Sequence, residues 1–125
     1  MKLILKILVT ILSVLFIVNG VRWLVAPAGI APTFGLELAD GIGLSSQIGD
    51  MAGFFLTLGT CALIGMISGQ RLWFYPAIML LGITATGRII AFLVHDATLA
   101  TQMIGIEAIA ALVFFVASRN LASDD

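Results

Sequence analysis

Apolar residues dominate four long segments of this chain. The segments span residues 3–26, 47–68, 72–94 and 98–118, and each supplies about the 20 apolar residues that a helix needs to cross the hydrocarbon core of a membrane. Because every backbone polar group must be satisfied within a bilayer, segments of this kind are helical. The pattern therefore predicts an all-α protein, a four-helix transmembrane bundle with up-down topology that occupies residues 1–125 as a single domain.

Composition agrees with this prediction and excludes several classes of protein. The chain has 125 residues, of which 61% are hydrophobic and 10% are charged, whereas a soluble domain carries about 25% charged residues. Its net charge of −1 gives no basic patch that could neutralise nucleic-acid phosphates. We therefore expect a lipid bilayer as the surroundings of the protein and no nucleic acid as a partner.

The basic residues at the segment ends predict the orientation. They flank one side of the predicted bundle, while the connections on the other side, residues 27–46 and 95–97, contain no Lys or Arg; these basic residues are Lys2, Lys6, Arg71 and Arg119. By the positive-inside rule both termini are cytoplasmic. We expect a multi-pass protein of the inner (plasma) membrane of a bacterium.

The first segment has an alternative interpretation as a cleaved signal peptide that ends at the small residues Ala26-Pro27-Ala28. Its apolar run is too long for that template, and Arg22 lies between the run and the proposed cleavage site. A transmembrane helix is therefore the preferred interpretation.

Residues 27–46 form the long connection, and their Pro and Gly residues predict a loop. The connection also contains large apolar residues, which indicate a segment that lies on the membrane surface or folds back over the bundle, with one helical turn around residues 36–39. A plain linker is the other interpretation. Ser46 is the expected N-cap of the second helix, ahead of Asp50 at the positive end of the helix dipole.

Small residues recur at every fourth position along the second predicted helix. Such a row lets two helix backbones approach closely in lipid. It predicts a packing seam, either within the bundle or with another copy of the chain, formed by Gly49, Gly53, Thr57, Cys61, Gly65 and Gly69.

Apart from Lys6 near the N-terminus, each of the four segments carries one charged residue: Arg22, Asp50, Arg88 and Glu107. A charge alone in hydrocarbon costs about 2.5 to 3.5 kcal/mol, so such residues normally face the protein interior and have partners. Helices that are neighbours in sequence pack side by side in an up-down bundle. The expected pairs are therefore Arg22 with Asp50 and Arg88 with Glu107.

Two interpretations of this polar cluster remain open. In the first, the charges are ion pairs that hold the helices in register; in the second, they form a pocket for the head of an amphipathic or lipid-soluble ligand. Asn19 and His95 lie in the same outer half of the predicted bundle. A cavity lined by Asn19, Arg88, Met103 and Glu107 would favour the second interpretation, and a collapsed core would favour the first.

The residues give little support for catalysis. One histidine, His95, cannot form the three- or four-ligand set of a zinc site, and no nucleophile with an accompanying base is visible. The single Cys61 is expected to be a small packing residue. We therefore expect no metal, no cofactor and no enzymatic activity.

Several single residues together resemble a family of small bacterial four-helix membrane proteins of unknown function. The resemblance rests on Gly20 and Pro27 in the first helix, Gly53 in the second, Gly87-Arg88 in the third, Asp96 in the outer turn and Glu107 in the fourth. The chain departs from that pattern at Ala97, where a glycine is usual, and at Gln47, where a charged residue is usual. The resemblance implies the bundle and the positions of Arg88 and Glu107, and it implies no substrate.

The sequence thus predicts a small non-catalytic membrane protein. We expect an accessory or scaffold subunit that docks on another membrane protein or on itself. The alternative is a binder or carrier of a small amphipathic molecule.

Overall fold

Four long helices make up most of the computed structural model, which describes residues 1–122. They are α1 (Lys2–Val25), α3 (Gly41–Ser68), α4 (Phe74–Val94) and α5 (Thr101–Asn120), joined through the short helices α2 (Pro27–Ile30), η1 (Ala31–Phe34) and η2 (Arg71–Trp73). All four long helices are long and apolar enough to cross a membrane. The predicted all-α fold class, with four candidate transmembrane helices, is confirmed.

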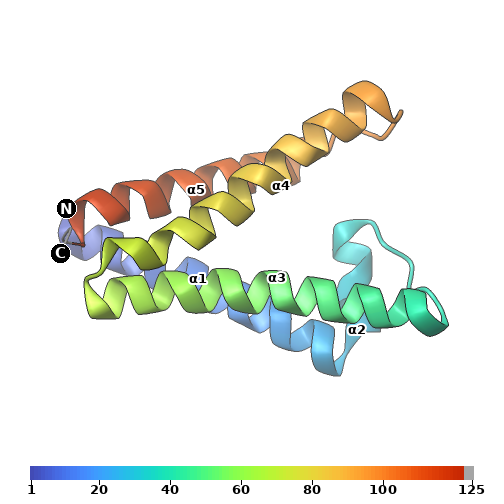
Figure 1. Cartoon of the computed structure of the whole chain (residues 1–125), viewed down its shortest axis with the longest axis horizontal. Helices are drawn as coiled ribbons and strands as arrows, with labels where there is room; N and C mark the ends of the chain where they lie inside the picture. Colours follow the sequence, from blue (N-terminus) through green and yellow to red (C-terminus); the bar gives the residue numbers. More distant parts are fainter. Residues whose placement is uncertain (123–125) are drawn as a thin grey trace.

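The long helices are arranged as two antiparallel pairs. Helix α1 packs along α3, and α4 packs along α5. The two chain termini and the α3–α4 turn lie at one end of the bundle, which we call the closed end (Figure 1). Toward the opposite end, which we call the open end, the α4–α5 pair diverges from the α1–α3 pair (Figure 1).

The buried core lies between and within these pairs. Its α1 side chains follow a seven-residue spacing, which keeps Val9, Phe16 and Trp23 on one helix face. They pack with α3, and the core continues through Phe74, Ala77 and Leu81 of α4 and Ala110, Phe114 and Ala117 of α5. Large apolar side chains also cover the outside of the helices, for example Ile11, Met79 and Ile109. An apolar exterior of this kind suits lipid as the surrounding solvent.

Two predicted helix boundaries were wrong. Helix α3 starts at Gly41, with Asp40 as its N-cap, instead of at residue 47 behind Ser46. Gly41 has a φ of 57°, a backbone conformation that glycine adopts without steric cost, so the chain can turn directly into the helix there. Helix α5 starts at Thr101 instead of at residue 98.

The long connection is folded, and its helical turns lie earlier than predicted. Residues 27–34 form α2 and η1, whereas residues 36–39 are not helical. Ile30 is fully buried, so the segment folds back onto the bundle as one of the two interpretations expected. Gln47 of α3 holds the rest of the connection, because its side-chain amide donates to the Glu37 carbonyl at 2.9 Å and accepts from the Ala39 amide at 2.8 Å.

The close contact between α1 and α3 does not use the predicted row of small residues. A Cβ atom added to Gly59 would lie 2.6 Å from the Ser13 carbonyl oxygen of α1. Gly59 is two positions from Thr57, a rotation of about 200° around the helix, so the row faces away from α1 at this level. Gly49 and Gly53 have no neighbouring atom within 4 Å of an added Cβ.

The remaining members of the row differ among themselves. Thr57 is exposed and Cys61 is half-buried. Gly65 packs closely, because an added Cβ would lie 3.0 Å from the Phe74 ring. Gly69 ends α3 with a φ of 71°. Within the bundle the row therefore does not form a continuous seam, since of its four glycines only Gly65 packs closely against another element among the described residues. Packing of the row against another copy of the chain stays a prediction.

Replacement of Gly59 with Ala should destabilise the protein, since the added methyl group meets a backbone carbonyl that cannot move aside. Overpacking of this kind costs about 1 to 3 kcal/mol. Gly53→Ala is the matched control on the same helix and should leave the free energy of unfolding unchanged or slightly raised. Unfolding of both variants in mixed micelles measures the difference, and equal stability of the two would contradict this account of the α1–α3 contact.

Candidate functional site

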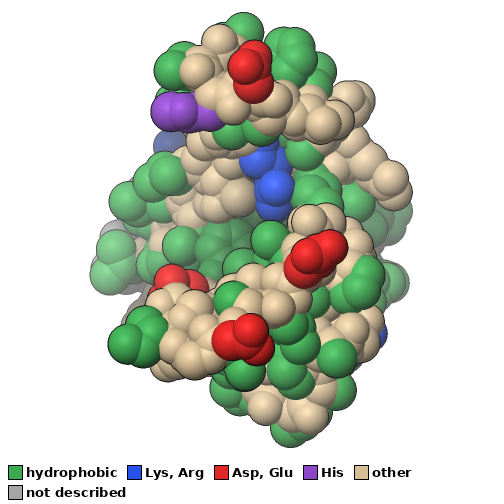
Figure 2. All heavy atoms as spheres, turned by 90° about the vertical axis from the view of Figure 1, so that its right-hand side faces the viewer, with side chains coloured by type: hydrophobic (Ala, Val, Ile, Leu, Met, Phe, Trp, Pro, Cys, Tyr) green, Lys and Arg blue, Asp and Glu red, His purple; other side chains and the backbone are tan. Residues whose placement is uncertain are grey.

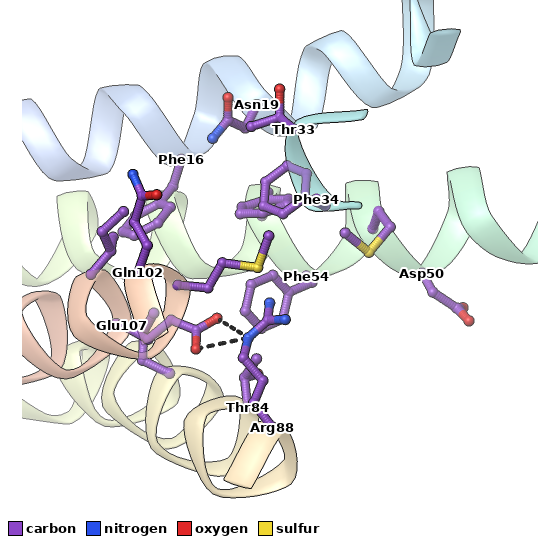
Figure 3. A pocket seen from close by; sticks show the side chains of 15 residues that line it. Phe16, Asn19, Thr33, Phe34, Asp50, Phe54, Thr84, Arg88, Gln102 and Glu107 are labelled. Carbon is purple, nitrogen blue, oxygen red and sulfur yellow. Dashed lines mark hydrogen bonds and ion pairs between the residues drawn. The ribbon is translucent and has the colours of Figure 1, made fainter. Parts of the chain in front are cut away.

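A cavity of about 530 Å³ lies between the two helix pairs on the open-end side of the bundle. All four long helices and η1 contribute side chains to it (Figure 3). Figure 2 views the molecule from the open end and shows basic side-chain atoms inside a hollow, with acidic side chains around it. The lining residues are Phe16, Asn19, Thr33, Phe34, Asp50, Met51, Phe54, Phe55, Leu81, Thr84, Arg88, Gln102, Met103, Ile106 and Glu107.

An ion pair between Arg88 of α4 and Glu107 of α5 forms one polar side of the cavity, which we call its floor. The Arg88 Nε atom donates to both carboxylate oxygens of Glu107, each at 3.0 Å (Figure 3). The side chains are 27% and 11% exposed, respectively. Because α4 and α5 pack antiparallel, these two residues lie at the same level, and the expected pairing is observed. A charge-assisted contact of this type lets both charges stay within an apolar bundle.

The pair uses only part of the Arg88 guanidinium group. A guanidinium carries five N–H donors, and those on the two η nitrogens of Arg88 have no acceptor among residues 1–122. The hydroxyl of neighbouring Thr84 donates to the Leu80 carbonyl at 2.6 Å and makes no hydrogen bond with Arg88. The floor of the cavity therefore presents free hydrogen-bond donors.

Further polar side chains line the cavity opposite this floor. The amide side chains of Asn19 on α1 and Gln102 on α5 face it, with Thr33 of η1 beside Asn19 (Figure 3). Neither amide has a hydrogen-bonding partner within the part of the chain that the structure describes. Each carries both donors and an acceptor, so polar groups converge on the cavity from three helices.

Aromatic rings form much of the remaining wall. The rings of Phe34 and Phe55 lie with their centroids 5.2 Å apart, those of Phe54 and Phe55 lie 5.0 Å apart, and Phe16 stacks on Phe55 at 6.1 Å. These contacts fall in the range of favourable aromatic pairs, about 4.5 to 7 Å. The wall is therefore rigid and apolar, in contrast to the charged floor.

The expected pair of Arg22 and Asp50 is not formed among the described residues. Arg22 is exposed at the end of α1, and its Nη2 atom donates to the Gly29 carbonyl of α2 at 3.1 Å. The tight turn after α1 supplies that acceptor close to Arg22, which the sequence pattern did not indicate. Asp50 lines the cavity instead, on α3 (Figure 3).

His95 also lies outside the cavity. It is exposed at the end of α4, beyond Arg88. The cavity thus brings together Asn19, Asp50, Arg88 and Glu107 from the predicted cluster, and Met103 lines it as expected. It does not include Arg22 or His95.

Sequence reasoning missed the aromatic wall, Thr33 and Gln102. Gln102 could have been identified from the sequence, because it is a polar residue near the start of an apolar segment. Phe34 had no such signal, because it reaches the cavity only through the fold of η1. Within residues 1–122, no group of three or more His, Cys, Asp or Glu side chains is placed to hold a metal ion.

Comparison of the chain with family models, curated proteins and solved structures gave no match. The structure has four helices that are candidate membrane spans. The resemblance to a family of small bacterial membrane proteins stays a prediction. The site must therefore be interpreted from its own geometry.

The Arg88–Glu107 pair leads to a test by a double-mutant cycle. Arg88→Leu leaves the Glu107 carboxylate without its partner in a mostly buried place, and loss of one member of a buried pair costs about 3 to 5 kcal/mol. Changing both residues to Leu should recover much of this loss, because no charge is then left unpaired. The free energy of unfolding in micelles gives the coupling, and a double variant no more stable than the single one would disprove the pairing.

Proposed function

We propose that this protein binds a small amphipathic molecule in the cavity at the open end. The observation that carries this proposal is an open cavity with unused donors on Arg88 beside an aromatic wall. A pair that served only to hold helices in register would need no such space. Ligand sites are typically about 300 to 1,000 Å³ and combine apolar walls with a few convergent polar groups.

The packing below the cavity supports binding in preference to passage across the membrane. Toward the closed end the two helix pairs meet through buried apolar side chains, including Phe74, Ala77 and Phe114. In the described chain, the buried polar side chains on this side of Glu107 are Ser13 and Ser118, and neither is ionisable. Ion and proton paths require ionisable or polar groups across the whole membrane.

The proposal includes an orientation. Lys2 and Arg119 lie near the two ends of the chain, and Arg71 lies in the α3–α4 turn, so basic residues gather at the closed end. The positive-inside rule then puts the closed end in the cytoplasm and opens the cavity toward the outside. A bacterial inner membrane is the location we propose.

A bulky side chain that fills the cavity should strongly weaken binding of an amphipathic ligand. Both Ile106 and Ile109 of α5 are exposed, at 52% and 64%, but only Ile106 lines the cavity, so Ile106→Trp places a large ring there and Ile109→Trp does not. Binding of a single-chain amphiphile to the purified protein, measured by native mass spectrometry, should fall about tenfold or more in Ile106→Trp and stay unchanged in the control, since a pocket of this kind buries most of its ligand. Equal binding by both variants would show that the ligand binds to another part of the surface.

An accessory or scaffold subunit is the second candidate function. It is supported by one face of α3, where a Cβ atom added to Gly49 or Gly53 would have no neighbour within 4 Å in the described chain and where Thr57 is exposed. Small residues permit close approach of a helix from another membrane protein or another copy.

This second candidate predicts a different result. Gly53→Leu should release a partner that copurifies from native membranes, because the larger side chain holds the two helices apart. Ile109→Leu, on an exposed face of α5, is the control. If the same partner copurifies equally with wild type and with Gly53→Leu, this face of α3 does not support a scaffold role.

A further inference from the structure

Two charged groups that line the cavity have unused binding capacity. The η nitrogens of Arg88 donate to no residue in the described chain. Asp50, on the facing helix α3, makes no hydrogen bond or ion pair with any of residues 1–122. The cavity therefore offers a cationic donor and, separately, an anionic acceptor.

The charge balance of the lining restricts the ligand. Its charged residues are Asp50, Arg88 and Glu107, so the formal sum is +1 − 1 − 1 = −1. The Arg88–Glu107 pair is neutral as a unit, and Asp50 supplies the excess negative charge. A purely anionic ligand would bring a second negative charge close to the exposed Asp50 carboxylate, and like charges repel each other. A ligand that carries a cation as well as an anion avoids this repulsion.

The order of groups along the bundle gives a second restriction. At about 1.5 Å per residue from the closed end of each helix, Leu81 lies roughly 10 Å up, Glu107 roughly 20 Å, Arg88 roughly 21 Å and Asp50 roughly 27 Å. Figure 3 likewise shows Asp50 displaced along α3 from the ion pair. From the deep end outward, the lining thus begins at the apolar Leu81, reaches the donors of Arg88 at about the level of the Phe16 and Phe55 rings, and ends at Asp50. This is the order of chain, anion and ammonium in a zwitterionic amphiphile.

We propose, building on the proposed function, that the ligand is an amphiphile with a zwitterionic head. Its anionic group accepts hydrogen bonds from the η nitrogens of Arg88, and its ammonium group lies beside Asp50. Its hydrocarbon chain packs on Leu81 at the deep end of the cavity and on the rings of Phe16 and Phe55.

The surroundings of the opening fit this assignment. Glu37, Asp40 and Asp96 lie on the connections at the open end and are exposed, and acidic side chains surround the hollow in Figure 2. Clustered charge of one sign raises the local concentration of groups of the opposite sign. An ammonium head is drawn toward this end, while a head that carries only negative charge is repelled.

The test compares two probes that share one acyl chain. Lysophosphatidylethanolamine carries the phosphate and the ammonium, and lysophosphatidylglycerol carries the phosphate alone. The full chain in a non-ionic detergent should bind the first about fivefold more tightly, which is the scale of one partly exposed ion pair. Asp50→Asn should abolish this preference. Asp40→Asn removes the same charge from the opening at a residue outside the cavity lining and should reduce the preference only slightly.

Each outcome separates the two proposals. If neither probe binds, the proposed function itself fails. If both bind equally to wild type, or if Asp50→Asn keeps the preference, ligand binding stands and the zwitterionic assignment is overturned.

A final comparison identifies the source of the ligand. Native mass spectra of protein released from nanodiscs of diacyl phosphatidylethanolamine and phosphatidylglycerol show whether one diacyl phosphatidylethanolamine stays bound. Its retention supports the assignment with a bilayer lipid as the occupant. Retention of only the added single-chain probe supports the assignment with a free single-chain zwitterion.

Discussion

The ion pair between Arg88 and Glu107 is the interaction on which the open end of this bundle depends. A charge within an apolar bundle needs a partner, and each of these residues finds one on the adjacent helix. Both belong to the α4–α5 pair, so the contact ties that pair together without drawing α1 and α3 toward it. The cavity persists because the charges are satisfied without closing it.

Side-chain size controls the distance between helices elsewhere. Gly20 and Gly59 let α1 and α3 approach to backbone contact, and Gly65 accepts the Phe74 ring near the closed end. At the open end, Phe16 and Phe55 stand between the two helix pairs instead. The same rings then supply the apolar wall that an amphipathic ligand requires.

The Arg88–Glu107 pair and the aromatic rings both line the cavity, and together they form the surface that we propose for ligand binding. An aromatic wall suits an apolar group, and unused donors on Arg88 favour a ligand with hydrogen-bond acceptors. The folded connection of α2 and η1 completes the site by bringing Phe34 and Thr33 to its edge. The features that would carry binding thus come from elements distant in the chain, while the closed end serves to hold those elements together.

The amino-acid sequence by itself determined the four spans, the antiparallel arrangement and the partnership of Arg88 with Glu107, because apolar length and the cost of a lone charge act locally or between neighbouring helices. Only the tertiary structure decided which face of α3 meets α1 and that Arg22 bonds to Gly29 and not to Asp50. Only the tertiary structure also decided that a cavity remains. These outcomes depend on helix rotation and on the fold of a glycine- and proline-rich connection, which periodicity alone does not specify.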